Sequence, residues 1–268
     1  MATAEHPFPP PRLVDTHCHL DLDAFATDRA EVLSRARAAG VARMLVPATD
    51  LLSSRRAVAL AEQHPELRVA VGVHPNDAQD FSAETLAELR DLAQHPQVDA
   101  IGEIGIDLYW HTVALEKQQQ AFRAQLALAA ELDRPVIVHD REAHAEVMAG
   151  LREITPGAGV VLHSFSGDQG MAEQALAAGF YLGVDGPLTY KKNVGLRDIF
   201  RIALLERILI ETDAPYLTPQ ARRGTRNEPA YVRFVAEQLA AVRASSLAQV
   251  ASATTANAAR LFRWELVE

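Results

Sequence analysis

The segment Leu13-Val14-Asp15-Thr16-His17-Cys18-His19, near the start of the chain, ends an apolar run with two histidines. In a β-strand, side chains two positions apart point to the same face, so His17 and His19 would project together and Cys18 away from them. Two imidazoles side by side at the end of a strand make half of a metal site. The second half would have to come from residues later in the chain.

Further apolar runs recur along the chain and, together with the first, predict eight β-strands. The runs are continuous rather than alternating, which is typical of parallel strands that are buried on both faces. The predicted strands are Arg12–Cys18, Arg43–Pro47, Arg68–Val73, Ala100–Glu103, Pro135–His139, Val160–His163, Phe180–Val184 and Arg207–Glu211.

Alanine- and leucine-rich stretches between the runs predict helices. Gly40 is a C-cap signal after the first helix, and proline in a His-Pro pair stops the second and third. At the start of the third, Ser82 can cap, but no Glu or Gln follows three residues on, so the signal is only partial. The predicted helices are Asp28–Ala39, Leu51–Gln63, Ser82–Gln94, Val113–Leu132, Ala143–Glu153, Gln169–Ala178, Leu196–Leu204, Pro229–Val242 and Leu247–Phe262.

Strands that alternate with helices in this way predict an α/β fold, a single-domain (β/α)8 TIM barrel. A doubly wound open sheet is the alternative, but no glycine-rich phosphate turn follows the first strand. With 268 residues, 49% of them hydrophobic, the chain can build one large core. We expect residues 1–11 to be a short proline-bearing tail and residues 12–268 to be the barrel domain.

Composition narrows the classes of partner and the location. A single cysteine excludes an internal disulfide framework, and the N-terminus lacks a signal-peptide pattern, so we expect a cytoplasmic protein. No apolar stretch approaches the ~18 residues that a membrane span requires. The net charge of −9 argues against nucleic-acid binding over the whole surface, but it leaves room for a local basic patch and for cation-binding carboxylates.

Polar residues stand at the carboxyl ends of the predicted strands, where barrels build their active sites. A single histidine there is more often a satisfied core residue, but a full set at one rim is costly to bury unless it is paired or bound to metal. Even without His74, four histidines and two carboxylates exceed one tetrahedral site and fit two cations, a pair suited to phosphate-ester hydrolysis. Mixed nitrogen and oxygen ligands favour Zn²⁺ or Mn²⁺, with Mg²⁺ as an alternative. The strand-end residues are His17, His19, His74, Glu103, His139, His163 and Asp213.

At these residues the sequence resembles the TatD family of metal-dependent deoxyribonucleases, within the amidohydrolase-like barrels. The resemblance extends from Leu13 to Phe262, and the motifs follow the family's order and spacing. They are Asp15-Thr16-His17-Cys18-His19-Leu20-Asp21, Val71-Gly72-Val73-His74-Pro75, Gly102-Glu103-Ile104-Gly105-Ile106-Asp107, Pro135-Val136-Ile137-Val138-His139-Asp140-Arg141, His163-Ser164-Phe165-Ser166-Gly167, Glu211-Thr212-Asp213-Ala214-Pro215-Tyr216-Leu217 and Asn227-Glu228-Pro229.

The resemblance implies a centre of two divalent cations and 3′→5′ exonucleolytic cleavage of DNA, sometimes of RNA. It implies that Glu103 bridges the cations and that Asp213 also orients or deprotonates the attacking water. Many related barrels carry a carboxylated lysine where this chain has Glu103, which favours the TatD arrangement. Under the resemblance, His17, His19 and Asp213 hold one cation, and His139 and His163 hold the other.

One departure from the family concerns the seventh strand. Family members often carry a serine where this chain has Gly183, and Asp185 adds an acid near the rim. We therefore expect the contacts of this loop with substrate to differ.

Residues near the strand ends could contact a phosphodiester substrate. His74, Arg141 and Arg223 are candidates, and Tyr109 with Trp110 could stack on a base. The plain alternatives are solvated loops for the charged residues, Lys191 and Lys192 included, and packing at the rim for the aromatic residues.

The sequence therefore predicts a two-metal deoxyribonuclease that trims 3′ ends of single-stranded or damaged DNA, an activity compatible with DNA repair. The expected partner is a nucleic-acid substrate, without a membrane or an obligate protein partner. A hydrolase of an amide, lactone or aminoacyl ester on the same barrel is the alternative, and a non-catalytic metal-binding barrel is the third hypothesis.

Overall fold

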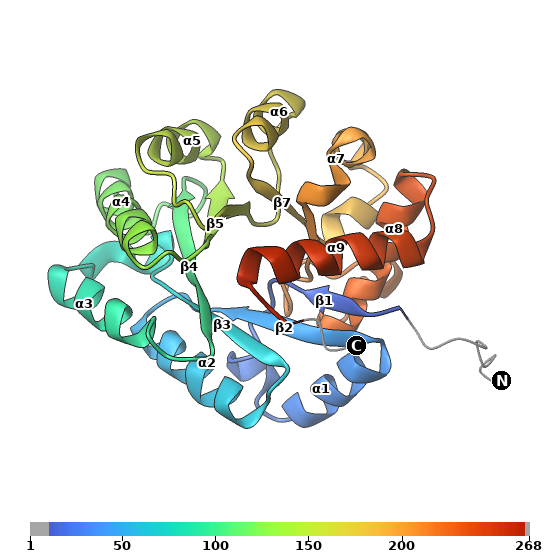
Figure 1. Ribbon diagram of the computed structural model, residues 1–268, viewed down its shortest axis with the longest axis horizontal. Coiled ribbons are helices and arrows are strands. Elements are labelled where there is room, and N and C mark those ends of the chain that lie inside the picture. Colours follow the sequence, from blue (N-terminus) through green and yellow to red (C-terminus); the bar gives the residue numbers. More distant parts are fainter. Residues whose placement is uncertain (1–10, 266–268) are drawn as a thin grey trace.

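Eight parallel strands form the centre of the molecule in a computed structural model that describes residues 11–265 (Figure 1). Each strand pairs with the next one along the chain, so the order in the sheet is the order in the sequence. The strands are β1 (Leu13–Asp15), β2 (Val41–Pro47), β3 (Leu67–Val71), β4 (Val98–Asp107), β5 (Val136–Arg141), β6 (Val160–Leu162), β7 (Tyr181–Val184) and β8 (Ile208–Ile210).

Hydrogen bonds between the ends of the sheet complete the barrel. The amide of Thr16 donates to the carbonyl of Ile210 at 3.1 Å, and the amide of Asp213 donates to the carbonyl of His17 at 2.8 Å. The predicted (β/α)8 barrel is confirmed, and the doubly wound sheet is excluded because its strand order would not be sequential. Except for Pro11, the predicted tail lies outside the described residues.

Helices surround the strands (Figure 1). Within residues 11–265 they agree with the predicted helices to within a few residues at each end, and the first turn predicted at Pro229 is a 3₁₀ turn. The third helix has a complete capping box, because the Ser82 amide donates to the Thr85 hydroxyl and the Thr85 amide to the Ser82 hydroxyl, both at 3.3 Å. The sequence therefore showed only half of this capping box, because Thr85 takes the place of the expected Glu or Gln. The α-helices are α1 (Arg29–Ala38), α2 (Leu51–Gln63), α3 (Ala83–Leu92), α4 (Leu115–Glu131), α5 (His144–Glu153), α6 (Gln169–Ala177), α7 (Val194–Ile202), α8 (Val232–Val242) and α9 (Leu247–Phe262).

Short 3₁₀ helices occupy several loops. None of the helices in the described part of the chain is long and apolar enough to cross a membrane. The 3₁₀ helices are η1 (Asp23–Phe25), η2 (Pro75–Asp80), η3 (Gly186–Thr189), η4 (Leu205–Arg207), η5 (Gln220–Arg222) and η6 (Pro229–Tyr231).

One end of the barrel interior is filled by the last helix, which crosses in front of the strands in Figure 1. Each strand contributes one side chain to a buried cluster, which packs against Leu261, Phe262 and Trp264. The indole of Trp264 donates to Asp99 at 2.5 Å. Because α9 covers this end, a site inside the barrel must open at the other end. The strand residues of the cluster are Val14, Leu45, Ala70, Ala100, Ile137, Val161, Tyr181 and Leu209.

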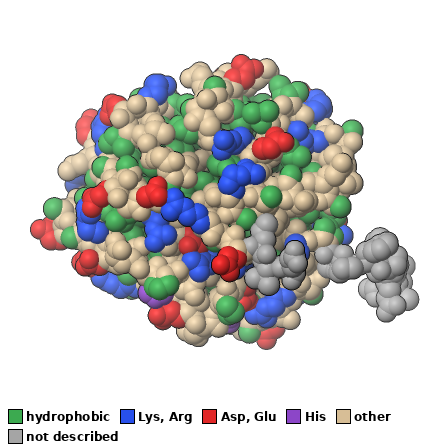
Figure 2. All heavy atoms as spheres, viewed as in Figure 1, with side chains coloured by type: hydrophobic (Ala, Val, Ile, Leu, Met, Phe, Trp, Pro, Cys, Tyr) green, Lys and Arg blue, Asp and Glu red, His purple; other side chains and the backbone are tan. Residues whose placement is uncertain are grey.

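Positive and negative charges are mixed on the face that carries α9. In Figure 2, Lys and Arg side chains on this face lie among Asp and Glu side chains. Interspersed charges do not create the strong local potential that a nucleic acid backbone requires. This face is therefore not the expected contact surface for a nucleic acid.

Several strand ends differ from the predicted ones near the functional residues. Strand β1 ends at Asp15, and β6 ends at Leu162, so His17, His19 and His163 follow their strands rather than belong to them. Strand β4 continues past Glu103 to Asp107, with a register shift against β5 between Ile101 and Ile104. A polar residue in the sequence does not show whether the backbone hydrogen bonds between two strands continue past it.

Gly105 makes the extension of β4 compatible with β5. Its φ is +150°, and a Cβ there would lie 1.9 Å from the carbonyl oxygen of His139. No side chain fits in that space, so glycine lets the backbones that carry Glu103 and His139 approach each other.

We expect Gly105→Ala to lower the free energy of unfolding by roughly 1–3 kcal/mol or more, because the new methyl group forces these backbones apart. Urea unfolding of the metal-free protein measures the effect. Gly157→Ala is the matched control, since a Cβ at Gly157 meets no atom within 4 Å. Equal stability of the two variants would contradict the role given to Gly105.

Candidate metal centre

His17 and His19 converge just beyond the end of β1. Their Nε2 atoms lie 3.2 Å apart. Between them, the Cys18 amide donates to the carbonyl of Leu45 at 3.1 Å, and the Cys18 thiol points to the same carbonyl at 3.6 Å. The alternation expected of a strand therefore persists for these three residues, with Cys18 buried away from the histidines.

Asp213 enters the same cluster from the segment after β8. Its Oδ1 lies 3.4 Å from His19 Nε2, 3.7 Å from His17 Nε2 and 3.8 Å from His163 Nε2. Buried Asp15 ties the two segments together, because its carboxylate accepts from the Thr212 amide at 2.9 Å and from the Thr212 hydroxyl at 2.6 Å. The position of Asp213 relative to the histidine pair therefore depends on Asp15.

Glu103 lies between two groups of histidines. Its Oε2 is 3.3 Å from His17 Nε2 and 3.7 Å from His19 Nε2. Its Oε1 is 2.8 Å from His139 Nδ1 and 3.8 Å from His74 Nε2. One carboxylate oxygen thus faces each group, which is the arrangement that a carboxylate bridging two cations requires.

Hydrogen bonds at the outer nitrogens set the tautomers of three histidines. Nδ1 of His19 lies 3.2 Å from the carbonyl of Pro47, and Nδ1 of His163 lies 2.8 Å from Glu211 Oε1. Nε2 of His139 lies 3.1 Å from Asp107 Oδ2. Since these oxygens only accept, the facing nitrogens carry the protons, and the other nitrogen of each neutral ring presents a lone pair to the centre.

These lone pairs and two carboxylates face one another without enough donors between them. Such an arrangement of neutral rings and carboxylates is unfavourable unless extra protons or a cation lie among them, so the donor set fits divalent metal ions. Within the described residues, Nδ1 of His17 is buried without a hydrogen-bond partner, a cost consistent with a residue retained for its Nε2. Three groups have ligand atoms within 4.8 Å of one another: His17, His19 and Asp213; His74, Glu103 and His139; and His17, His163 and Glu211.

Charges in the centre shift several pKa values in the protein without metal. Burial lowers the pKa of His163, but Glu211, Glu103 and Asp213 outweigh it and raise it to about 10. Burial also lowers the pKa of His139, but Asp107 and Glu103 outweigh it and raise this pKa to about 9. Burial would raise the pKa of Glu103, but the surrounding histidines hold it well below its usual range.

Two acids that the sequence prediction did not include support the histidines from behind. Fully buried Glu211 accepts from His163, from the Ser164 amide at 2.6 Å and from the Thr16 hydroxyl at 3.4 Å. Asp107 accepts from His139 and also holds the amides of Tyr109 and Trp110, at 2.8 and 3.0 Å. Glu211 lies two residues before Asp213, and Asp107 lies four residues after Glu103. In a strand, an even spacing places two side chains on the same face, and this was the sequence signal that could have identified both acids.

The structure also explains the departure at β7. A Cβ at Gly183 would lie 2.4 Å from Glu211 Oε1, so the absence of a side chain leaves room for this carboxylate. Asp185 is only 2% exposed and accepts from the Ser164 hydroxyl at 2.7 Å. Asp185 directly follows the last residue of β7, near the rim, but it is buried and orients the loop after His163.

The candidate substrate contacts lie in three places. The Arg141 guanidinium lies 4.2 Å from the ring centre of Tyr109 and 5.6 Å from that of Trp110, and both rings are exposed. Arg223 lies 4.9 Å from the ring centre of Tyr190. His74 stays with Glu103 and His139 inside the centre. Other charges after β8 are engaged elsewhere, since Arg226 pairs with Asp28 at 2.7 Å and Arg222 lies over Tyr231 and Phe234.

Comparisons with known proteins give a consistent result. A model of the family described as TatD related DNase matches residues 14–263. The chain is 40% identical to the metal-dependent hydrolase YabD of Bacillus subtilis (strain 168), over 94% of this chain and 99% of that protein. It is also 40% identical to the 3′-5′ ssDNA/RNA exonuclease TatD of Erwinia tasmaniensis, over 93% and 99%. The crystal structure of YJJV, a TatD homologue from Escherichia coli K12, superposes with a TM-score of 0.90 at 34% identity, over 95% of this chain and 99% of that one.

We expect Glu211→Gln to weaken the binding of Zn²⁺ or Mn²⁺ by about 10–100-fold, because a neutral amide supports the His163 imidazole less well than a carboxylate. Isothermal titration of the metal-free protein measures the affinity. Glu237→Gln, on the outer surface of α8, is the control and should bind as the unchanged protein does. An unaltered affinity in Glu211→Gln would refute this supporting role.

Metal affinity should fall as the pH falls from 9 to 6. With pKa values of about 9 and 10, His139 and His163 each hold an extra proton at neutral pH that a cation must displace. Each such proton lowers the affinity by up to about tenfold per pH unit below its pKa. Titrations in buffers of different ionisation enthalpy count the released protons, and binding without proton release would contradict the assignment.

Proposed function

The chain belongs to the family of TatD related DNases, and from this membership we propose that it is a 3′→5′ exonuclease that shortens single-stranded DNA or RNA. As a member of this family it is a metal-dependent hydrolase. The observation that carries the proposal is the convergence of five histidines on the two oxygens of Glu103. Asp213 lies beside three of these histidines. The exonuclease name of a relative 40% identical over 93% of the chain supports the substrate class.

We assign two divalent cations, Zn²⁺, Mn²⁺ or Mg²⁺, to this centre. His17, His19 and Asp213 would hold the first, His139 and His163 the second, and Glu103 both. Support comes from the distances of Glu103 Oε2 to the His17 side and of Oε1 to the His139 side, 3.3 and 2.8 Å. The chemistry that two bound cations supply is activation of water and neutralisation of charge on the phosphodiester.

Asp213 is suited to orient the attacking water and to take its proton. Burial would raise the pKa of its carboxyl, but the hydrogen bond with His19 and the charges of His163 and His17 lower it. The group is therefore ionised at neutral pH and can accept a proton. Its side chain is 13% exposed, whereas that of Glu103 is 4% exposed, so Asp213 is the more accessible of the two to water.

His74 is suited to donate a hydrogen bond to the substrate, although it lies in a group that could hold a metal. Its Nδ1 accepts from the Asn76 amide at 3.1 Å, so in the neutral ring the proton stands on Nε2, which faces the centre. Burial, with the charge of His139, lowers the pKa of His74 to about 3, so the ring is neutral. A protonated Nε2 is a donor for a phosphate oxygen rather than a metal ligand.

Single-stranded substrates fit the exposed residues beside the centre. The rings of Tyr109 and Trp110 are 44% and 57% exposed, and Arg141 lies against both. Unpaired bases stack on such rings with roughly 1–3 kcal/mol each, and a nearby cation offsets phosphate charge. Asp107 holds the amides of both aromatic residues and contacts His139, so one carboxylate joins the proposed stacking surface to a proposed ligand.

A 5′-labelled single-stranded oligonucleotide should be shortened stepwise from its 3′ end in the presence of Mn²⁺ or Mg²⁺, and a chelator should stop the reaction. Glu103→Gln and Asp213→Asn should each reduce the rate at least about 100-fold, because each change removes a proposed ligand and, for Asp213, the proton acceptor. Glu237→Gln serves as the control. Absence of shortening by the pure protein, or full activity of Glu103→Gln, would refute the exonuclease.

A further inference from the structure

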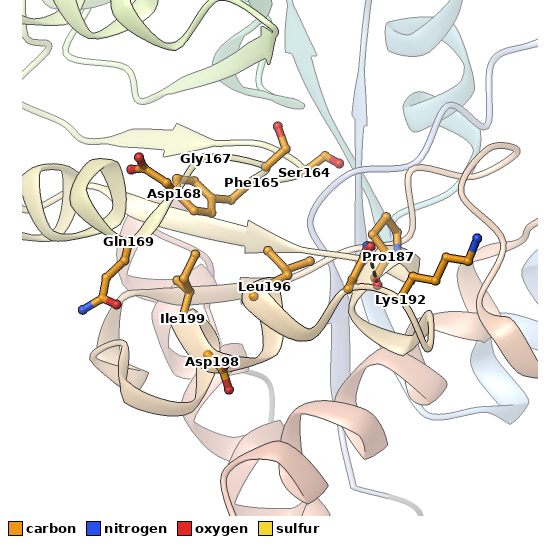
Figure 3. Close-up of a pocket in the computed structure, with 13 residues that line it drawn as sticks. Ser164, Phe165, Gly167, Asp168, Gln169, Pro187, Lys192, Leu196, Asp198 and Ile199 are labelled. Atoms are coloured by element: carbon orange, nitrogen blue, oxygen red, sulfur yellow. Dashed lines mark hydrogen bonds between the residues drawn. The ribbon is translucent and has the colours of Figure 1, made fainter.

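A cavity of about 660 Å³ opens beside the metal centre, between the loop after β6 and the start of α7 (Figure 3). We propose that it binds one unpaired nucleobase of the substrate, next to the phosphodiester bond at the centre. This inference rests on the proposed exonuclease function and adds a base-binding site to it.

One residue of the cavity wall neighbours a proposed metal ligand in the chain. Ser164 lines the cavity and directly follows His163 in the chain. The Ser164 amide donates to Glu211 at 2.6 Å and its hydroxyl to Asp185 at 2.7 Å. Because buried acids hold this residue at both atoms, the wall between the centre and the cavity is fixed. In the proposed arrangement, the phosphate of a nucleotide lies at the centre and its base lies beyond Ser164, in the cavity.

The walls suit a flat apolar ring. Phe165 lies on one side, and Leu196 and Ile199 lie on the opposite side, on α7 (Figure 3). Ligand cavities of about 300–1,000 Å³ with apolar walls and a few polar groups are typical for small molecules. One base fits that description.

Charges along the cavity distinguish a base from a phosphate. Ser164 and Lys192 lie at one end in Figure 3, and Asp168 and Asp198 lie toward the other end. Lys192 attracts phosphate on the side of Ser164. At the outer end, Arg201 pairs with Asp198, and Asp168 accepts from the Met171 amide through one oxygen, which leaves its second oxygen to repel phosphate. The outer end can instead accept hydrogen bonds from amino groups on the edge of a base. We therefore assign the base, and not the backbone, to the cavity.

This assignment has a consequence for substrate choice. A base can enter the cavity only after it leaves its pair and its stack, and that step costs least in a single strand. The cavity would thus favour single-stranded ends independently of the stacking surface formed by Tyr109 and Trp110.

Filling the cavity from Gly195 tests the proposal. A Cβ at Gly195 meets no atom within 4 Å, so Gly195→Trp can extend over the cavity without displacing the backbone. Gly157→Trp is the matched control, because Gly157 is equally open but lines a separate cavity near Arg207 and Arg260. We expect Gly195→Trp to raise KM for single-stranded oligonucleotides at least tenfold. Bis(p-nitrophenyl) phosphate has no base, so the fold-increase of its KM should be at least five times smaller than that of the oligonucleotide. Gly157→Trp should change neither KM value.

A binding measurement separates this proposal from the exonuclease function. The metal-loaded protein should bind a deoxynucleoside 5′-monophosphate at least fivefold more tightly than deoxyribose 5-phosphate, and Gly195→Trp should remove that difference. Equal binding of the two ligands, or an unchanged KM in Gly195→Trp, overturns the base site even if oligonucleotides are shortened. If the unchanged protein shortens no oligonucleotide but still prefers the nucleotide, the exonuclease proposal fails and the base site stands.

Discussion

The contacts of Glu103 are the constraint on which the centre depends. This carboxylate is buried at the middle of a barrel end, and each of its oxygens faces a different set of imidazoles. A charge in such a place is costly unless compensating groups surround it on every side. Strand β5 and the segments after β1, β3 and β6 supply those groups, and Asp213 joins them from the segment after β8. The closure of the barrel and the assembly of the centre are therefore one structural condition.

Buried acids around the centre extend the same logic outward. Asp15 joins the segments of His17 and Asp213, Glu211 sets the tautomer of His163, and Asp107 sets that of His139. None of these acids needs to touch a substrate. Each determines which nitrogen of a histidine, or which segment, faces the centre, and metal affinity depends on such support. Even the absence of a side chain at Gly183 belongs to this arrangement, because Glu211 occupies the space.

Family and fold could be predicted from the sequence with few errors, for physical reasons that act locally. Continuous apolar runs predict strands buried on both faces, and helix ends are marked by Gly40 and by the His-Pro pairs. Six predicted strand ends, those of β1, β3, β4, β5, β6 and β8, were wrong by a few residues, because the extent of a ladder depends on a neighbouring strand. Glu103 looked like the last residue of its strand, yet Gly105 allows β4 to continue beside β5.

By itself, the sequence determined the barrel and the residues that converge at its open end. It also excluded Cys18 as a metal ligand. The alternation of side chains along a strand and the order of parallel strands are properties of the chain. Only the tertiary structure decided which atoms face one another. The opposed oxygens of Glu103, the support from Asp107 and Glu211, and the cavity beside Ser164 all join residues from different strands. Such contacts depend on the register and closure of the barrel, which no local pattern in the sequence encodes.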